Sequence, residues 1–142
     1  MGLRADPVQS NISSNKARGT LRGMHFQRPP DAEAKLVRCT AGAMYDVIVD
    51  LRPGSPSFMQ WAGYELTAEN RKALYIPEGF AHGFQTLADD TEVFYQMFNF
   101  FAPASAAGLR WDDPAFRIKW PLDNPILSDK DRAYPDFDGV PL

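Results

Sequence analysis

Cysteine and histidine are scarce in this chain of 142 residues, which has one cysteine and two histidines. A single cysteine excludes an internal disulfide and a cysteine-based metal cluster. Cys39 lies in an apolar segment, which is typical of a small core residue. Two histidines, His25 and His82, are too few for a metal site that needs three of them.

Long apolar runs and an excess of basic charge are also missing. No apolar run approaches the roughly 20 residues that span a bilayer, and no charged-then-apolar leader opens the chain. The net charge of −3 argues against a nucleic-acid binder. We therefore expect a soluble, cytoplasmic protein with no membrane or nucleic-acid partner. Residues 1–38 nevertheless hold seven Lys or Arg against three Asp or Glu, which indicates either a local anion site or chance variation.

Short segments with alternating apolar residues are present, and a turn signal interrupts them about every ten residues. Seven or eight strands at this spacing indicate a sandwich or a jelly-roll barrel, in one domain over residues 1–142. A short helix is expected to begin at Ser128, and residues 102–107 are a second helical candidate. The expected strands, after a polar one around residues 9–13, cover residues 19–27, 35–40, 43–51, 60–66, 73–76, 80–87 and 91–98.

Polar residues stand at alternate positions near the N-terminus, at Gln9, Asn11 and Ser13. On a strand these side chains share one face, which fits either a pocket wall or a solvated edge strand. In the next predicted strand, Gly23 allows a bulge or a close approach of another backbone. Lys35 shares a face with two apolar residues, and it fits a strand end from which it reaches water.

A metal centre is the first chemical hypothesis to test. Pro77, Gly79 and His82 match the P-x-G-x-x-H motif of cupins, small β-barrels that often hold a metal. The companion H-x-H motif fails, because Gln27 stands two residues after His25. A cupin shell without a metal is the more economical interpretation.

A pocket without a metal must use acid–base groups. Imidazole titrates nearest neutrality, so His25 suits a general base, which needs a carboxylate partner to orient it. Asp131 is one candidate, although Ser128-x-x-Asp131 is also typical of a helix cap. Tyr95 fits a core tyrosine or a proton donor. His82 has Phe80 and Phe84 on its face, which favours a buried histidine.

Several ordered blocks from Gln9 to about Pro135 carry a more specific signal. The chain resembles the dTDP-4-dehydrorhamnose 3,5-epimerase family in the order and spacing of these blocks. They are Gly19-Thr-Leu-Arg-Gly-Met-His25-Phe-Gln27, Lys35-Leu-Val-Arg38, Pro77-x-Gly-Phe-Ala-His82-Gly-Phe84, Arg110-Trp-Asp-Asp-Pro114, Ile118-x-Trp-Pro121 and Ile126-Leu-Ser-x-Lys-Asp131.

The resemblance implies a homodimeric jelly-roll cupin that needs no metal or other cofactor. It implies inversion of carbons 3 and 5 of a nucleotide-linked 4-keto-6-deoxyhexose through an enolate, as in dTDP-L-rhamnose biosynthesis. By resemblance, His25 is the base and Asp131 its partner, Lys35 stabilises the oxyanion, and Tyr95 returns a proton. Further residues by resemblance are His82, which lines the site, and the substrate-binding Arg22, Gln9, Asn11, Lys130 and Phe101.

Two departures from the family pattern keep other functions open. Many members have a tyrosine where Phe101 stands, so a C3-only or C5-only epimerase is one alternative. Members also carry several dozen residues before the position of Gln9, against eight here, which leaves a non-catalytic sugar-nucleotide-binding cupin as another. A metal-dependent cupin dioxygenase ranks last.

Overall fold

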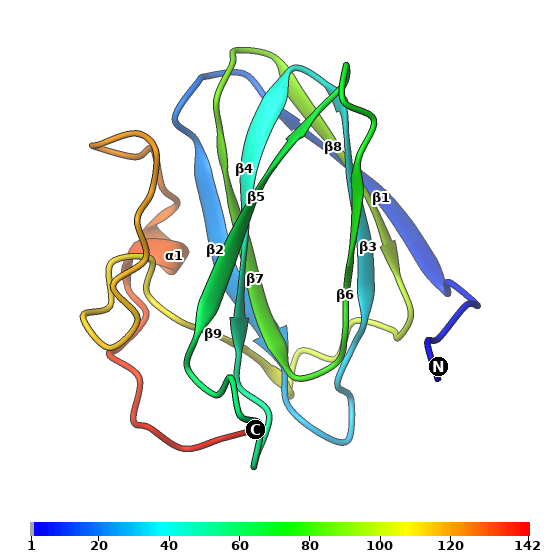
Figure 1. Cartoon of the computed structure of the whole chain (residues 1–142), viewed down its shortest axis with the longest axis vertical. Helices are drawn as coiled ribbons and strands as arrows, with labels where there is room; N and C mark the ends of the chain where they lie inside the picture. The colour runs from blue at the N-terminus through cyan, green and yellow to red at the C-terminus, as the bar shows by residue number, and fades with distance from the viewer. Residues whose placement is uncertain (1) are drawn as a thin grey trace.

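The computed structural model describes residues 2–142, which form two antiparallel β-sheets and one short helix (Figure 1). One sheet has the strand order β1-β8-β3-β6, and the other has the order β5-β4-β7-β2-β9. The strands are β1 (Gln9–Asn15), β2 (Leu21–Gln27), β3 (Lys35–Ala41), β4 (Ala43–Asp50), β5 (Trp61–Thr67), β6 (Ala73–Ile76), β7 (Phe80–Thr86), β8 (Thr91–Met97) and β9 (Ala106–Gly108), and the helix is α1 (Asp129–Arg132).

These elements confirm the expected all-β fold with a short helix near the C-terminus. The predicted strands lie within two residues of the observed ones, because each reflects a local alternation of apolar and polar residues. The helix expected over residues 102–107 is wrong. Its end instead forms β9, which pairs with the edge of β2. The helical preference of so short a segment is weak, and the open edge of β2 offers backbone partners that a helix would not use.

Strand β4 contributes to two apolar cores, one on each of its faces. Met44 packs between the sheets in a cluster with Val37, Cys39 and Phe84. The alternate residues Val47 and Val49 belong to a second cluster, on the opposite face of the same strand. Both clusters are fully buried at their centres, so β4 is packed on both of its faces.

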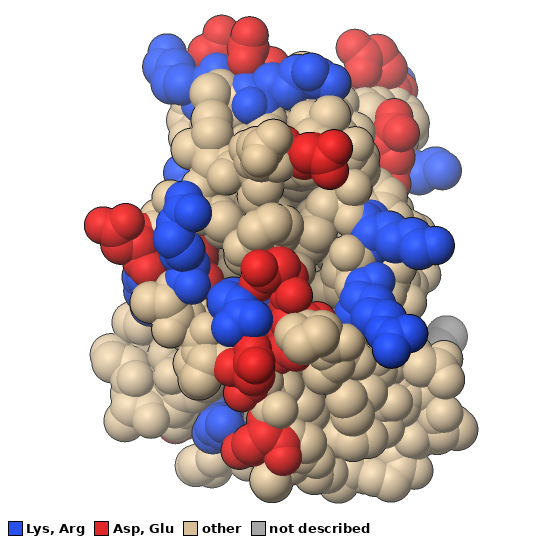
Figure 2. Space-filling model, turned by 90° about the vertical axis from the view of Figure 1, so that its left-hand side faces the viewer, with Lys and Arg blue, Asp and Glu red and all other residues tan. Residues whose placement is uncertain are grey.

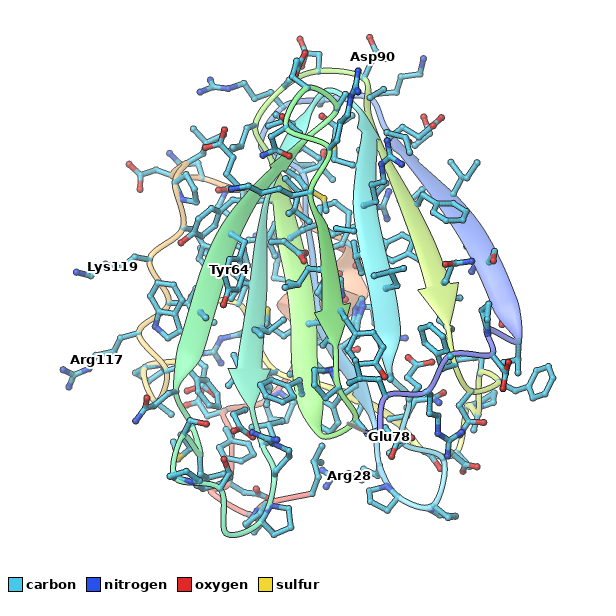
Figure 3. The ribbon with its side chains drawn as sticks, turned by 45° about the vertical axis from the view of Figure 1, so that its right-hand side comes forward. Arg28, Tyr64, Glu78, Asp90, Arg117 and Lys119 are labelled. Carbon is cyan, nitrogen blue, oxygen red and sulfur yellow. The ribbon has the colours of Figure 1, made fainter. Side chains whose placement is uncertain are left out.

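The segment after β9 covers the second cluster. Leu109 and Phe116 bury their side chains in that cluster, and Trp120 packs against it. Arg117 and Lys119 point away from the body of the protein (Figure 3). Lysines and arginines lie among aspartates and glutamates on this side of the molecule, so no patch of one sign forms there (Figure 2). Within residues 2–142, no helix is long and apolar enough to cross a membrane.

A β-bulge in β2 decides which side chains face the space between the sheets. Arg22 pairs with Phe84 of β7, and His25 pairs with His82, so three steps along β2 match two along β7. Residues three apart on a regular strand face opposite ways, and the extra residue brings Arg22 and His25 to the same face. Gly23 permits this, with φ at +114° and a backbone close to Gly83. The expectation of a bulge or close approach at Gly23 is confirmed.

Candidate active site

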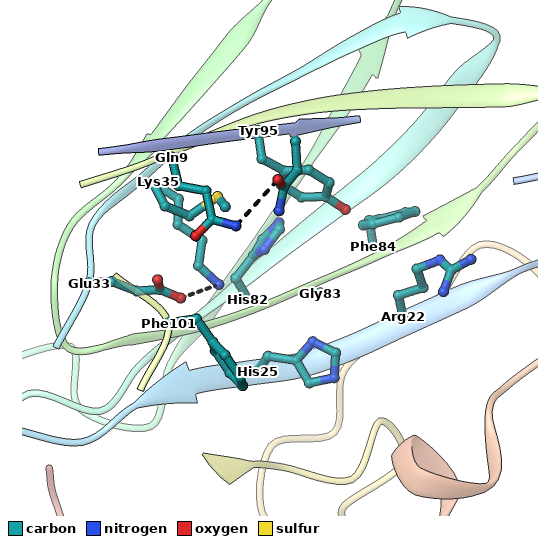
Figure 4. Close-up of a pocket in the computed structure, with 12 residues that line it drawn as sticks. Gln9, Arg22, His25, Glu33, Lys35, His82, Gly83, Phe84, Tyr95 and Phe101 are labelled. Atoms are coloured by element: carbon teal, nitrogen blue, oxygen red, sulfur yellow. Dashed lines mark hydrogen bonds and ion pairs between the residues drawn. The ribbon is translucent and has the colours of Figure 1, made fainter. Parts of the chain in front are cut away.

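A cavity of about 400 Å³ opens between the sheets at the end where β2, β3, β7 and β8 meet (Figure 4). Eight of the ten residues singled out from the sequence line it, and each sheet contributes some of them. The lining residues are Gln9, Asn11, Arg22, His25, Glu33, Lys35, His82, Gly83, Phe84, Tyr95, Met97 and Phe101. The two other expected residues, Asp131 and Lys130, lie on α1 beside the cavity.

His25 and Asp131 form a short polar contact at this cavity. Nε2 of His25 lies 2.6 Å from Oδ1 of Asp131, and the second carboxylate oxygen accepts the Gly23 N–H at 3.1 Å. The carboxylate is 7% exposed and the imidazole 42% exposed, so the aspartate lies behind a histidine that reaches the cavity. This leaves Nδ1 as the ring nitrogen available to a ligand.

The pKa of Asp131 falls below its ordinary value. Burial alone would raise this pKa, but the hydrogen bond and charge of His25, together with the N–H of Gly23, outweigh burial. The carboxyl group is therefore ionised at neutral pH and can stabilise a protonated imidazole.

Both interpretations of Ser128-x-x-Asp131 hold at once. Ser128 is the N-cap of α1, and its hydroxyl accepts the Asp131 N–H at 3.1 Å. The cap uses the backbone of Asp131 and leaves its side chain free to turn toward His25. A helix of four residues is thus enough to fix a carboxylate against a strand that lies more than 100 residues earlier.

His82 belongs to a second, more deeply buried histidine–aspartate pair. Its Nε2 lies 2.6 Å from Oδ1 of Asp46, with exposures of 5% and 0%. The other carboxylate oxygen of Asp46 has no hydrogen-bond partner among the described residues. Asp46 lies on the inward face of β4, between apolar neighbours, and an acidic residue at such a position was a signal that the sequence analysis missed.

Lys35 lies at the start of β3, but its side chain does not reach bulk water as the sequence analysis expected. Its ammonium group lies 3.0 Å from Oε1 of Glu33, and the two side chains are 14% and 11% exposed. Both line the cavity (Figure 4). Glu33 had no sequence signal, because it lies in the loop between two strands and outside any alternating pattern.

Tyr95 enters the cavity from the sheet opposite His25. Its ring meets the ring of His82 edge-on, with centroids 6.3 Å apart. Burial raises the pKa of the phenol, and the charge of Asp46 raises it further, against smaller opposite effects of Arg22 and Ser13. The hydroxyl is therefore protonated at neutral pH, as a proton donor must be.

The expected substrate-binding residues on β1 and β2 form two polar contacts. Nε of Arg22 donates to Oδ1 of the buried Asn15 at 2.6 Å, which holds the guanidinium group at the cavity. Gln9 donates to the side chain of Asn11 at 3.3 Å. Strand β1 is also the outer strand of its sheet, so its polar face is both an edge and a pocket wall.

Gln27, which stands at the missing metal-ligand position, ties down the loop that carries Phe101. Its amide donates to the carbonyl groups of Asp31 and Phe100, and its oxygen accepts the Ala102 N–H at 2.7 Å. Phe101 is 63% exposed and borders both the main cavity and a neighbouring one of about 190 Å³. Lys130 lines only the smaller cavity, so it reaches a ligand of the main cavity only across Phe101 and His25.

Within residues 2–142, no group of three or more His, Cys, Asp or Glu side chains is arranged to hold a metal ion. The two histidines are each bonded to an aspartate through Nε2. Acid–base chemistry is the chemistry that these side chains support.

Comparison with known proteins gives a consistent result. The model of the family described as dTDP-4-dehydrorhamnose 3,5-epimerase matches residues 1–139. The enzyme of that name from Shigella flexneri is 47% identical over 131 residues, which cover 92% of this chain and 72% of the relative.

Solved structures agree with this match. The dTDP-4-dehydrorhamnose 3,5-epimerase of Bacillus anthracis, with TDP and PPi bound, aligns with a TM-score of 0.93 and 47% identity over 96% of this chain and 78% of that one. The epimerase of Legionella pneumophila, in complex with dTDP-4-keto-L-rhamnose, aligns with a TM-score of 0.87 and 40% identity over 94% and 70% of the two chains.

Proposed function

This chain belongs to the dTDP-4-dehydrorhamnose 3,5-epimerase family and has that activity in dTDP-rhamnose biosynthesis, and we propose that His25 and Tyr95 perform the proton transfers. The observation that carries the proposal is their placement. His25, bonded to Asp131, and Tyr95 face one cavity from opposite sheets. Inversion of a carbon requires that a proton leave one face and return to the other, which two opposed groups can do.

The reaction begins at a carbon next to the ketone of a dTDP-linked 4-keto-6-deoxyhexose. Nδ1 of His25 takes the proton, the C–H electron pair forms the enolate double bond, and the carbonyl oxygen becomes negative. The carboxylate of Asp131 stabilises the imidazolium that results. Lys35 supplies a positive charge for the enolate oxygen.

Tyr95 completes the inversion by donating its hydroxyl proton to the opposite face, and the enolate collapses to the ketone. The raised pKa keeps this proton on the phenol until the carbanionic carbon takes it. Solvent then returns a proton to Tyr95 and removes one from His25. These steps use the side chains named here and solvent.

Binding of the nucleotide part falls to the basic and polar residues at the cavity mouth. Arg22 offers a guanidinium group, which suits phosphate oxygens. Gln9 and Asn11 offer amides, Lys130 adds an ammonium group from the smaller cavity, and Phe101 offers a ring on which a base can stack. These roles apply to a dTDP-linked sugar, the ligand class of the Legionella complex.

The partner part of the proposal is a homodimer in the cytoplasm. Within residues 2–142, β1 pairs with β8 alone, and Ile12 on it is 63% exposed. An open strand edge with an exposed apolar side chain suits pairing with a second copy. The single buried thiol, Cys39, suits a reducing compartment. Size-exclusion chromatography with light scattering should give twice the mass of one chain. A monomer at all concentrations would contradict the dimer.

Deuterium exchange tests the proton-transfer roles. In D₂O the wild-type protein should incorporate solvent deuterium at carbons 3 and 5 of the dTDP-4-keto-6-deoxyhexose. NMR of the sugar measures the rate of this incorporation. His25→Asn should lower the rate about 10²- to 10⁴-fold, with binding of dTDP retained. Tyr95→Phe should still exchange protons but invert the carbon slowly, because the base alone returns deuterium to the face it attacks.

Two results would overturn these assignments. Exchange at the wild-type rate in the folded His25→Asn protein would remove His25 as the base. A non-catalytic sugar-nucleotide-binding protein would bind the ligand and give no exchange in the wild type. Binding by calorimetry beside exchange by NMR separates these cases.

A further inference from the structure

Tyr134 lies against the ring of His25, on the same short segment that carries Asp131. The two ring centroids are 6.2 Å apart, and the planes meet at 68°, an edge-to-face contact. Tyr134 follows the end of α1, three residues after Asp131. One turn of chain therefore brings both a carboxylate and an aromatic ring to the same imidazole.

Gly108 provides the seat for this tyrosine ring. It is the cross-strand partner of His25 in the β2–β9 pair. A Cβ atom at position 108 would overlap Cζ, Cε1 and Cε2 of Tyr134. The ring thus lies directly on the backbone of β9, beside His25, and only glycine leaves room for it there.

The hydrogen bond to Asp131 does not by itself fix the plane of the imidazole. A single contact at Nε2 leaves the ring free to rock about the line joining Nε2 and Oδ1. The ring edge of Tyr134 restricts that motion, and an aromatic pair of this geometry is favourable beyond the area it buries. The smaller cavity, lined by Tyr134 and Lys130, adjoins His25, so loss of the ring would also admit water to the pair.

We propose that Tyr134 is a positioning residue for His25, and that its ring, seated on Gly108, sets the plane in which the imidazole meets the substrate. The proposal rests on the proposed role of His25 as the base. The hydroxyl group has no part in it, because the contact is made by the ring.

Four variants separate the ring from the hydroxyl and from general stability: Tyr134→Ala, Tyr134→Phe, Gly108→Ala and the Gly108→Ala/Tyr134→Ala double variant. Tyr134→Ala should lower kcat about tenfold and leave KM within about twofold, since misplacement of a reacting group affects the chemical step. Tyr134→Phe should rescue this loss. Gly108→Ala should lower kcat as Tyr134→Ala does, because its methyl group displaces the ring.

The double variant gives the sharpest result. With the ring removed, the methyl group at position 108 occupies the vacated space, so the second substitution should cost no further activity. Tyr64→Ala is the matched control, because Tyr64 is 44% exposed on β5 and lines neither cavity beside His25. Its kcat should equal that of the wild type.

Proton NMR adds a readout that a purely structural role would not change. The 2.6 Å contact between His25 and Asp131 should give a downfield N–H signal. In Tyr134→Ala this signal should exchange with water faster at temperatures well below the melting point, and in Tyr134→Phe it should persist.

The outcomes distinguish this inference from the function on which it rests. If His25→Asn retains wild-type exchange, both fail. If His25→Asn is inactive while Tyr134→Ala retains wild-type kcat, the inference alone is wrong. Equal losses in Tyr134→Phe and Tyr134→Ala would assign the effect to the hydroxyl. Additive losses in the double variant would show that the contact between Gly108 and the Tyr134 ring does not position His25. Either result overturns the proposal.

Discussion

His25 and His82 stand opposite each other in the register of β2 and β7, and each is bonded through Nε2 to its own aspartate at 2.6 Å. The environments differ. His82 and Asp46 are almost fully buried, whereas the His25 side chain is 42% exposed. The same pairing thus holds one imidazole fixed in the wall and presents the other to a ligand. The exposed one has the placement that the proposed base requires.

Asp131→Asn should lower kcat by about 10² to 10⁴ while dTDP still binds. The amide cannot neutralise an imidazolium ion, and it can favour the wrong tautomer of His25. Ser128 still caps α1 through the backbone of residue 131, so the helix should persist. Steady-state kinetics and thermal melting together check this. A large fall in melting temperature with kcat unchanged would indicate a structural role for Asp131.

Gly23→Ala should destabilise the fold by about 3 kcal/mol or more, within the range of severe single substitutions. A Cβ atom there would lie 2.7 Å from Cα of Gly83 and from the His82 carbonyl oxygen, at a φ of +114° that side chains rarely adopt. Urea denaturation measures the loss. Gly54→Ala is the matched control, with φ at +71° but nothing within 4 Å of its Cβ. Gly54→Ala should lose less free energy of unfolding than Gly23→Ala. The difference between the two losses measures the clash, apart from the strain of a positive φ.

Local patterns in the sequence account for most of the strands and for the bulge at Gly23, because alternation and glycine act over a few residues. The partners of the two histidines are different. Asp131 lies 106 residues from His25, and periodicity could not distinguish its side chain from a helix cap. Family resemblance, not pattern, pointed to that pairing.

The residues missed by sequence reasoning are those whose roles arise from tertiary packing. Glu33 meets Lys35 where the loop before β3 lines the cavity, and Tyr134 meets His25 only because Gly108 makes room. The misassigned residues 102–107 belong to the same group. Their alanines favour a helix, and the open edge of β2 overrode that preference.

The stability of the protein should fall as the pH drops from about 5 into the acid range, and Asp50 should contribute to this. Burial would raise the pKa of Asp50, but Arg52, Ser55 and Ser57 donate to its carboxylate and hold that pKa well below the ordinary 3.8. A carboxyl group with a depressed pKa in the folded state stabilises the fold above its unfolded pKa. That contribution is lost as the pH falls through the folded value.

Asp50→Asn removes this charge and should flatten the acid limb of a plot of melting temperature against pH. At pH 7 the variant should be about 2 kcal/mol less stable, since it weakens hydrogen bonds to a charged group. Some slope should remain, because the pKa of Asp131 is also lowered. Calorimetry from pH 3 to pH 7 makes the comparison, and identical slopes in the two proteins would contradict the assignment to Asp50.

Phe101 should limit one of the two epimerisations. Its ring borders both cavities beside His25, and Gln27 holds the loop on either side of it, but phenylalanine has no proton to donate. In the wild type, one of carbons 3 and 5 should therefore invert faster than the other, although the base exchanges deuterium at both. Phe101→Tyr places a hydroxyl at the cavity mouth and should speed the slower inversion about tenfold, below the full 10²- to 10⁴-fold effect of a positioned acid.

Phe100→Tyr is the control for this change. Phe100 is the neighbouring residue, is 66% exposed and lines neither cavity, so a hydroxyl there should leave both inversion rates unchanged. An NMR time course in D₂O records both carbons in one experiment. Equal inversion rates at the two carbons in the wild type, unaltered in Phe101→Tyr, would mean that Tyr95 donates the proton at both carbons, and that Phe101 acts only as a surface for stacking.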